Sequence, residues 1–467
     1  MSSPAVSHAN KEISLVTLKK NALINAVLIY PNSYSVGMSN LGVHTVYNIL
    51  NSREDTLCER VFFEKKRKQP QSLENKRNLR SFDLIAFSIS YELDYLNFFK
   101  LMSQIFPEDD IRKRPFMPLV ISGGIVNSVN FKPLSKFCDC IFIGESEESL
   151  PEFMDILSGF ENINTLQKKI NFLKKAASIN GVFVPGVSDE KKVKGSFIKR
   201  LDEYPTSSKF ITPFTEFSNT FLIEISRGCP WKCNFCITGA LCGKFRPRSF
   251  EVIKKQIDEG LQYTNKIGLM GAAITDHPQI DKIIDYLLRK KALISVSSLR
   301  IETAGEMLLK ALADSGQKTI TFAPEAGSDS LRFSLNKRIT NKQILEKIVL
   351  SKKCGIKKVK LYFMIGLPHE TDTDILAIVQ LAEAASMILP LRLNVGIFVP
   401  KPQTIFAQHA FVKKKQCLDK FKLLKRNFSA SKNIILSHSS FTEAKLEWLF
   451  SRADEDFFFD HFYTKKN

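Results

Sequence analysis

Four cysteines lie close together in the stretch IEISRGCPWKCNFCITGALCGKF, which covers residues 223–245. Three of them, Cys229, Cys233 and Cys236, have the spacing C-x3-C-x2-C within one loop. Three thiolates suit three irons of a [4Fe–4S] cluster, whereas four would fill its coordination places. The fourth iron then stays open to a further ligand, and an open place is the mark of a catalytic metal site rather than a structural one. The loop therefore predicts a catalytic iron–sulfur cluster held by these three cysteines.

A closed zinc site is the main alternative for the same stretch, with Cys242 as the fourth ligand. The 3-then-2 spacing and the lack of a paired C-x2-C knuckle favour the cluster, so we expect Cys242 to be a nearby spectator. The remaining cysteines are expected to be free thiols; they are Cys58, Cys138, Cys140, Cys354 and Cys417.

The sequence contains no apolar run of about 18 residues that would predict a membrane span. The N-terminal stretch has no apolar core of signal-peptide length. We therefore expect a cytoplasmic protein with reduced thiols, in which clustered cysteines serve as metal ligands or catalysts more often than as disulfides.

The formal net charge is +19, carried largely by short lysine runs such as residues 64–69, 357–360 and 412–416. A basic surface attracts nucleic acid or another polyanion. No run is interleaved with the aromatic side chains that stack on bases. Solvated lysine-rich faces are the favoured interpretation, and a nucleic-acid partner is an open alternative.

The N-terminal part of the chain alternates apolar runs with helical patterns. Runs at residues 24–32, 83–90, 118–124 and 140–146 predict buried strands that end in small or polar residues. Strands alternating with helices imply a parallel sheet with helices on its faces. Small residues where strands end suit a ligand-binding crevice, although they also suit tight turns. These residues are Gly37, Gly42, Ser88, Ser90, Gly123 and Gly124.

The alternation restarts after residue 219 with a steadier period. Strands are predicted at residues 220–226, 266–271, 293–298, 319–324, 359–366 and 393–400. Amphipathic stretches such as PQIDKIIDYLLRK lie between them. Six βα units predict a partial TIM-type (β/α)6 barrel with its active site at the carboxyl ends of the strands.

The fold class is therefore α/β, with a Rossmann-like parallel sheet followed by a partial barrel. We expect a polar N-terminal tail at residues 1–20, the parallel-sheet domain at 21–155 and a connector at 156–215. The barrel is expected at 216–405 and a mostly helical segment at 406–467.

Longer motifs resemble a known family. They are YPNSYSVGMSNLGVHTVYNILN, FDLIAFSISYELDYLN, SRGCPWKCNFC, SSLRIETAGEMLLKALADSGQKTITFAPEAGSDSLR, KLYFMIGLPHET and FVPKPQT. They are similar to a group of bacterial radical S-adenosylmethionine (SAM) proteins in which a cobalamin-binding-like domain precedes the barrel. The resemblance spans roughly residues 25–405. It implies that the open iron of the cluster chelates SAM, which is cleaved to a 5′-deoxyadenosyl radical.

The resemblance also implies roles for single residues. Phe235 would contact adenine, and Gly271 and Ala272 would present backbone to the SAM amino group. The family's Gly-Gly-Glu turn reads MGAAITD (270–276) here, so Asp276 is the candidate to replace the absent glutamate. Further SAM contacts are expected from Ser298 and Arg300 after the third strand, Glu325, Ser328 and Arg332 after the fourth, and Gly366 after the fifth.

Structural interpretations of some of these residues stay open. Arg300 and Glu325 could form an ion pair across the barrel mouth. Glu370 is interpreted as a charge at a helix start, and His277, which precedes a proline, as a turn residue.

Cobalamin domains of this kind carry D-x-H-x-x-G after the first strand, but the corresponding place reads GMSNLG (37–42). His44 falls two residues beyond the motif. Candidate contacts are then Ser39, Ser88, Ser90, Gly123 and Gly124. Cobalamin binding without a motif histidine and loss of cobalamin are both compatible with the sequence.

The predicted function is that of a radical SAM enzyme, with cobalamin-dependent methyl transfer to an unactivated carbon as the first subtype. Its substrate is unknown, and its electron donor would be a flavodoxin or ferredoxin. The alternatives are an RNA-modifying, methylthiotransferase-like enzyme and a non-enzymatic metal-binding protein. The cysteines of the N-terminal part count against the RNA-modifying alternative, because Cys58, Cys138 and Cys140 lack the separation that a second cluster needs.

Overall fold

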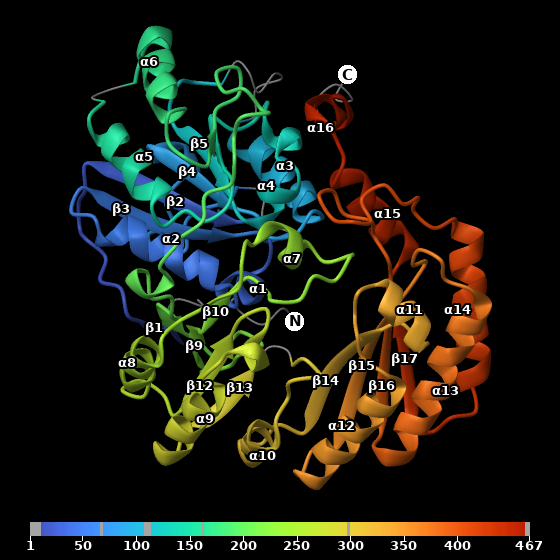
Figure 1. Cartoon of the computed structure of the whole chain (residues 1–467). Coiled ribbons are helices and arrows are strands. Elements are labelled where there is room, and N and C mark those ends of the chain that lie inside the picture. Colours follow the sequence, from blue (N-terminus) through green and yellow to red (C-terminus); the bar gives the residue numbers. More distant parts are fainter. Residues whose placement is uncertain (1–10, 66–68, 107–113, 161–162, 297–298, 463–467) are drawn as a thin grey trace, which may run out of the picture. The chain divides into compact units, whose positions relative to one another are not determined.

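The computed structural model describes residues 11–65, 69–106, 114–160, 163–296 and 299–462. The chain forms two compact units (Figure 1). The first unit runs to Phe221 and takes in the chain again from Phe450, and the second covers Leu222–Leu449. None of the described helices combines the length and apolar character needed to span a bilayer.

A six-stranded sheet in the order β3-β2-β4-β5-β6-β7 forms the centre of the first unit. Its strands are β2 (Ile24–Tyr30), β3 (Thr56–Phe62), β4 (Leu84–Ser88), β5 (Leu119–Gly123), β6 (Cys140–Phe142) and β7 (Val182–Phe183). Strands β2 to β6 pair in parallel, and β7 is antiparallel to β6. The chain goes from β2 to β3 on one side and to β4 on the other. The topological switch point therefore lies between β2 and β4, where open α/β sheets bind ligands.

Helices of the first unit follow its strands. They are α1 (Tyr34–Met38), α2 (Leu41–Ser52), α3 (Asp94–Ile105), α4 (Ile125–Val129), α5 (Ser149–Ser158), α6 (Leu166–Ala176) and α16 (Glu455–Phe462), with short 3-10 turns at Leu79–Ser81, Lys132–Leu134 and Leu201–Glu203. A separate antiparallel pair joins β1 (Ile13–Ser14) to β8 (Phe210–Ile211). Phe458 of α16 stacks on Phe99 of α3, with ring centroids 4.4 Å apart.

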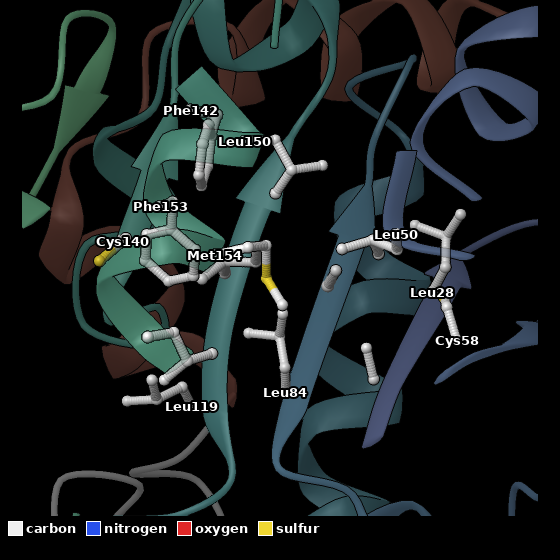
Figure 2. Close-up of a cluster of buried hydrophobic side chains, with 14 of the residues drawn as sticks. Leu28, Leu50, Cys58, Leu84, Leu119, Cys140, Phe142, Leu150, Phe153 and Met154 are labelled. Atoms are coloured by element: carbon white, nitrogen blue, oxygen red, sulfur yellow. The ribbon is translucent and has the colours of Figure 1, made fainter. Parts of the chain in front are cut away.

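A hydrophobic core of this unit lies between the sheet and helices α2 and α5. Figure 2 shows Leu28, Leu84 and Leu119 from the strands facing Leu50, Leu150 and Met154 from the helices. Strands β2 and β4 have almost uninterrupted buried runs, as parallel strands covered on both faces do. Cys58 and Cys140 also lie in this core, each with 0% of its surface exposed.

The second unit contains two sheets. Strands β9 (Phe221–Glu224), β12 (Lys266–Met270) and β13 (Leu293–Val296) form one, in the order β13-β12-β9, and β14 (Thr319–Glu325), β15 (Lys358–Ile365), β16 (Leu391–Ile397) and β17 (Ile434–His438) form the other. The second sheet is parallel throughout. Helices follow the strands: α8 (Phe250–Gly260), α9 (Ile280–Arg289), α10 (Glu306–Asp314), α11 (Asp329–Ser334), α12 (Asn341–Lys353), α13 (Asp372–Ile388), α14 (Lys414–Phe428) and α15 (Phe441–Phe450). This βα alternation makes the unit a partial TIM-type barrel.

Alternating burial shows how the barrel strands lie. On β14, β15 and β16 every second residue is buried, as in Val359, Leu361, Phe363 and Ile365 of β15. The buried residues face the layer of helices, and α12 and α13 lie along this side of the sheet in Figure 1. The intervening residues form the inner face of the barrel.

Every strand predicted from the sequence is confirmed, with ends that differ by a few residues. Several described strands were not predicted, among them β3, β7 and β17. β3 was missed because it carries Glu59 and Arg60, which are buried through ion pairs that a hydropathy pattern does not reveal. β7 lies in the stretch expected as a connector, and β17 lies in the segment expected to be helical. Part of the segment expected to be an N-terminal tail forms strand β1, which pairs with β8.

Arg60 forms the most buried ion network of the first unit. Its Nη2 lies 2.7 Å from Glu12 Oε2 and its Nε lies 2.7 Å from Glu74 Oε1. Its guanidinium lies 3.7 Å from the ring centroid of Phe210. Only 2% of the Arg60 side chain is exposed, so removing it would leave two carboxylates buried without their cation.

We predict that Arg60→Ala lowers the free energy of unfolding of the first unit by about 3–5 kcal/mol, the cost of breaking a buried ion pair. The matched control is Arg200→Ala, because Arg200 pairs with Glu203 while 79% of its side chain is exposed. Surface pairs contribute about 0–1 kcal/mol. Chemical denaturation of both variants tests this, and equal effects would contradict a structural role for the buried network.

Candidate functional site

The cysteine loop leaves the barrel at the end of β9 and returns through a small hairpin. β10 (Ser226–Arg227) pairs with β11 (Arg246–Pro247) in antiparallel fashion, and the short helix α7 (Ile237–Leu241) lies between them. Gly228 opens the loop with φ +72°, and a Cβ there would lie 2.6 Å from Lys244 O. This position therefore requires glycine.

A charged network fixes the base of the loop. Glu224 Oε2 accepts from Arg248 Nη2 at 2.7 Å and lies 2.9 Å from Arg227 Nε. Burial alone would raise the pKa of Glu224, but the two guanidinium groups hold it below its usual value. His277 Nε2 lies 2.9 Å from Arg248 O, and His277 Nδ1 accepts from the backbone N–H of Gln279. The interpretation of His277 as a turn residue is confirmed.

Contacts from outside the loop hold its middle. Asn234 N–H donates to Leu335 O at 3.0 Å, and Asn234 Nδ2 donates to Ser334 O at 2.9 Å. Asn336 Nδ2 returns a hydrogen bond to Lys232 O at 2.6 Å. The loop is therefore tied to the turn that follows α11, on both sides of Cys233.

The three thiols of the motif are half-buried and free. Burial raises the pKa of Cys233, and the positive charges of Lys337 and Arg300 oppose that rise. Burial also raises the pKa of Cys229. Cys236 acts electrostatically on both of the other thiols, so the three lie in one neighbourhood beside two cations that would stabilise thiolates.

This donor set fits a cluster better than a single ion. Among the described residues, no three or more His, Cys, Asp or Glu side chains are arranged to hold one metal ion. A zinc ion needs its ligands to converge on one centre. A [4Fe–4S] cluster instead takes each thiolate on a different iron, so three separate thiols in one fixed loop meet its requirement.

Trp231, Asp276, Arg300 and Glu302 form a second network beside the thiols. Trp231 Nε1 donates to Asp276 Oδ1 at 2.9 Å, and the Arg300 guanidinium lies 4.3 Å from the centroid of the Trp231 ring. Arg300 Nη2 lies 2.6 Å from Glu302 Oε1, while Arg300 Nε is 3.9 Å from Asp276 Oδ2. The indole of the cysteine loop is thus held between a carboxylate and a guanidinium.

This network contains unsatisfied polar atoms. Asp276 Oδ2, Arg300 Nε and Glu302 Oε2 are buried and have no hydrogen-bond partner among the described residues. Burial raises the pKa of Asp276, and the Trp231 hydrogen bond and the Arg300 charge only partly oppose it. Such atoms cost about 1–3 kcal/mol each when left unpaired, and in native proteins they indicate a missing ligand, ion or water.

Glu325 ends β14 in a strained conformation, with φ +73°. Its Oε1 lies 3.2 Å from Lys337 Nζ, and Lys337 is itself buried. Left-handed backbone at a non-glycine residue costs of the order of 1–3 kcal/mol and clusters at functional sites. The ion pair between Arg300 and Glu325 is not formed, because each has a different partner.

The remaining predicted SAM contacts have local partners. Ser328 caps α11 by accepting from Leu331 N and also bonds Asp374. Arg332 is fully buried and donates to Ala326 O at 2.6 Å and Ile339 O at 2.8 Å. All of its nitrogen atoms act within its own turn, so its role in the structure is to shape the loop after β14.

The turn after β15 is held by a buried carboxylate. Gly366 N–H donates to Glu370 Oε2 at 2.8 Å, and Lys420 bonds the same carboxylate. Glu370 is 1% exposed and precedes the N-cap of α13, Thr371. Glu370 lies at the start of α13, as expected, and its carboxylate is also bound by the turn and by Lys420.

The other predicted positions are found as follows. Gly271 and Ala272 directly follow β12, and Gly271 lies against Ser226. Ser298 lies outside the described residues. Phe235 packs against an apolar cluster formed by Ala326, Leu331, Leu335, Leu367, Phe398 and Phe406.

The carboxyl edge of the first unit's sheet carries the predicted small residues. Ser90 Oγ accepts from Asn40 Nδ2 at 2.9 Å, and Ser88 ends β4. Gly124 has φ +112°, and a Cβ there would lie 2.1 Å from Ile89 O, so the turns after β4 and β5 touch. Ser39 caps α1 and donates to Ser35 O. Near this edge, Asp94 Oδ2 is buried without a hydrogen-bond partner among the described residues.

His44 is committed to the fold of the first unit. Its Nε2 lies 3.1 Å from Met38 O, and its Nδ1 accepts from Lys209 N at 2.8 Å. Burial lowers its pKa to about 4. Both ring nitrogens are used, so His44 has none left for a metal ligand.

Sequence reasoning missed three side chains of the site. Trp231 and Lys337 lie next to the thiols, and Glu302 lies next to Arg300. Trp231 lies inside the cysteine motif, so its place in the sequence alone could have indicated that it belongs to the site. Lys337 and Glu302 come close only through tertiary folding.

We predict that the His44 network makes the first unit less stable in acid. The unfolded imidazole titrates near 6.5 and the folded one near 4, so the unfolded state binds the proton first. Stability is lost as the pH falls from about 6.5 toward 4, with a slope of at most about 1.4 kcal/mol per pH unit. Denaturation between pH 7 and pH 4.5 should show a flatter profile for His44→Gln, whereas parallel profiles would contradict this.

Two family profiles match the chain. The radical SAM superfamily matches residues 223–382. The N-terminal domain of radical SAM proteins matches residues 42–185.

Relatives extend over different lengths. An uncharacterized protein of Methanocaldococcus jannaschii is 32% identical over 92% of this chain and 89% of its own. An uncharacterized methyltransferase of Pyrococcus horikoshii is 26% identical over 56% of this chain and 57% of its own. A tRNA-2-methylthio-N(6)-dimethylallyladenosine synthase of Sulfurihydrogenibium is 28% identical over 49% of this chain and 52% of its own.

A solved structure has a similar fold. The radical SAM methyltransferase TsrM of Kitasatospora setae, with cobalamin and a [4Fe–4S] cluster bound, gives a TM-score of 0.58 at 12% identity, covering 83% of this chain and 77% of TsrM. The likeness supports the order of a parallel-sheet unit followed by a partial barrel. With the cysteine loop in place on that barrel, the profile matches show that this chain belongs to the radical SAM superfamily.

Proposed function

We propose that this chain is a radical SAM methyltransferase that uses cobalamin to methylate an unactivated carbon of its substrate. The observation that carries the proposal is the combination, in one chain, of a three-thiol loop on a partial barrel and a doubly wound sheet with a switch point between β2 and β4. The similarity to a methyltransferase of Pyrococcus horikoshii and to TsrM supports it.

The chain uses a [4Fe–4S] cluster and SAM, as its family does. When bound, the cluster supplies the electron that breaks the sulfonium–C5′ bond of SAM. The protein's own part is to bind and orient. Cys229, Cys233 and Cys236 would hold three irons, and the hydrogen bonds of Asn234 and Asn336 fix the loop that presents them.

Asp276 and Arg300 are the residues that would orient SAM. Asp276 Oδ2 and Arg300 Nε lie 3.9 Å apart as an ion pair, but neither makes a hydrogen bond to a described residue. Asp276 Oδ2 is thus an acceptor suited to the α-ammonium group, and Arg300 Nε a donor suited to the α-carboxylate. Trp231 holds both side chains in place through its N–H and its ring face. Asp276 thereby takes the part of the glutamate that the MGAAITD turn lacks.

Lys337 would act electrostatically and through Glu325. Its ammonium lowers the pKa of Cys233 against the effect of burial, which favours the thiolate that binds iron. Its ion pair with Glu325 also holds the strained end of β14. Glu325 is thereby fixed at the carboxyl edge of the barrel, where SAM would bind.

Cobalamin would bind at the carboxyl edge of the first unit's sheet. Ser88, Ser90, Gly123 and Gly124 lie on the β4 and β5 side of the switch point, and the unpaired Asp94 Oδ2 offers an acceptor near it. His44, the histidine next to the motif position, is fully used by Met38 and Lys209. We therefore propose binding without a histidine on cobalt.

The RNA-modifying alternative is weakened by the cysteines of the first unit. A methylthiotransferase-like enzyme would need three accessible thiols there for a second cluster. Cys58, Cys138 and Cys140 are at most 5% exposed, and burial raises the pKa of each. They are core residues, and Figure 2 shows Cys58 and Cys140 at opposite ends of the core cluster.

The partners of the enzyme are a substrate and a reductant. A flavodoxin or ferredoxin is the proposed electron donor.

We predict that Asp276→Asn weakens SAM binding by about 10- to 100-fold, the worth of a hydrogen bond to a charged group. Asparagine keeps the acceptor for Trp231 but removes the negative charge, so iron content should be unchanged. Anaerobic equilibrium dialysis of the reconstituted protein measures the Kd for SAM. Asp281→Asn on the exposed start of α9 is the matched control, and equal affinity in both variants would contradict this role.

Equilibrium dialysis with methylcobalamin tests the methyltransferase proposal itself. We expect one molecule bound per chain. Bound cobinamide, a corrinoid that lacks its own axial base, should give a Co(II) EPR signal without splitting by an axial nitrogen after one-electron reduction from Co(III). No binding up to high micromolar concentration would exclude the cobalamin-dependent reaction. Nitrogen splitting would instead contradict binding without histidine.

A further inference from the structure

The inner face of the four-stranded barrel sheet has an unusual charge pattern. Strands β14 to β17 contain three Lys or Arg residues, Lys358, Lys360 and Arg392, and one carboxylate, Glu325. All three cations lie on the half-buried or exposed positions of the alternation, opposite the helix-covered face. Glu325 is already paired with Lys337.

The register brings two of these cations together. Lys360 of β15 and Arg392 of β16 are direct cross-strand partners. Like charges at directly opposite positions destabilise a sheet. Lys360 Nζ lies 4.7 Å from the ring centroid of Tyr362, and no described residue forms a hydrogen bond or ion pair with the Arg392 side chain. The sheet therefore carries an uncompensated repulsion that a bound anion would relieve.

A row of polar side chains follows on the same face, one layer nearer the carboxyl edge. Tyr362 pairs with Asn394, and Asn394 pairs with Ser437 of β17. Ser437 Oγ donates to Asn394 Oδ1, which leaves the amide N–H groups of Asn394 available as donors. Tyr362 is 37% exposed and presents a ring face. This row would suit the uncharged middle of an elongated ligand.

The distance along the strand sets the size of that ligand. Lys360 lies five residues before Ile365, the last residue of β15, which at the rise of a strand is about 16 Å from the carboxyl edge. Glu325 and the turn at Gly366 lie at that edge. An anion held here would therefore lie well away from the carboxyl edge, so a ligand that joins the two places has to be elongated.

We propose that the inner face of β15 and β16 binds the substrate through an anionic group, a carboxylate or a phosphate, held between Lys360 and Arg392. The substrate is then an elongated small-molecule anion whose far end meets the SAM site. Arginine suits either oxyanion because its planar fork binds two oxygens at once. This inference rests on the proposed function for the identity of the site, but the binding of the anion does not depend on it.

The test is anion binding to the reconstituted holoenzyme and to the double variant Lys360→Gln/Arg392→Gln. Isothermal titration with inorganic phosphate and, separately, with succinate should give a Kd at least tenfold weaker in the double variant. The thermal midpoint of the unliganded variant should be unchanged or higher, because the repulsion is removed. Lys353→Gln on the exposed side of α12 is the control for charge alone and should bind as the wild type does.

Each result decides the matter. Equal anion affinity in wild type and double variant, or no binding of either anion to the wild type, overturns the proposal. A thermal midpoint lower by more than about 5 °C shows that the two cations stabilise the sheet, and also overturns it. The proposal is also overturned if the wild type binds a single-stranded RNA but neither small anion, and the double variant loses that RNA binding. If phosphate binds more tightly than succinate, the substrate is a phosphorylated compound. If succinate binds more tightly, the substrate is a carboxylic acid.

Formation of 5′-deoxyadenosine without substrate separates this inference from the proposed function. The double variant should cleave SAM at the wild-type rate, because Lys360 and Arg392 each lie five residues before the carboxyl end of their strand. Anion binding without any SAM cleavage in the wild type would defeat the proposed function and leave the anion site standing. If the wild type cleaves SAM and the double variant does not, the two cations are needed for SAM cleavage itself. That result would overturn the proposal that the anion site is separate from the SAM site.

Discussion

The site depends on the hydrogen bonds between the cysteine loop and the turn after α11, which Asn234 donates from the loop and Asn336 donates from the turn. A loop that must keep one iron open cannot be fixed by wrapping all of its ligands around a metal. Its rigidity has to come from outside, and here the backbone on either side of Cys233 is tied to the turn between α11 and α12. Arg332, buried in α11, donates to Ile339 O and Ala326 O on either side of that helix. The loop thus depends on residues a hundred positions further along the chain.

Two charged networks flank this loop and differ in how completely they are satisfied. The Glu224, Arg227 and Arg248 network at the base pairs its carboxylate with two guanidinium groups, which is what a structural support needs. The network of Asp276, Arg300 and Glu302 leaves three buried atoms without hydrogen bonds. At about 1–3 kcal/mol each, such atoms persist where a ligand completes them. The contrast separates the support of the site from the surface that would hold SAM.

Much of this arrangement could be predicted from the sequence, because parallel barrel strands are marked by local apolar runs. The thiol motif was equally local. β3 was missed because Glu59 and Arg60 are buried by partners that lie far away in the chain. The same cause hid Lys337 and Glu302, and it hid the partner of Glu370, Lys420, which lies on α14. Charges that are buried in pairs cannot be recognised from one member of the pair.

The central claim is that three thiolates hold a cluster with one iron open to SAM. Anaerobic reconstitution followed by iron analysis and EPR of the reduced protein, with and without SAM, tests it most directly. The account predicts about four irons per chain and a signal that changes when SAM is added. Stoichiometric zinc with no iron, or a cluster signal that SAM leaves unchanged, would contradict it.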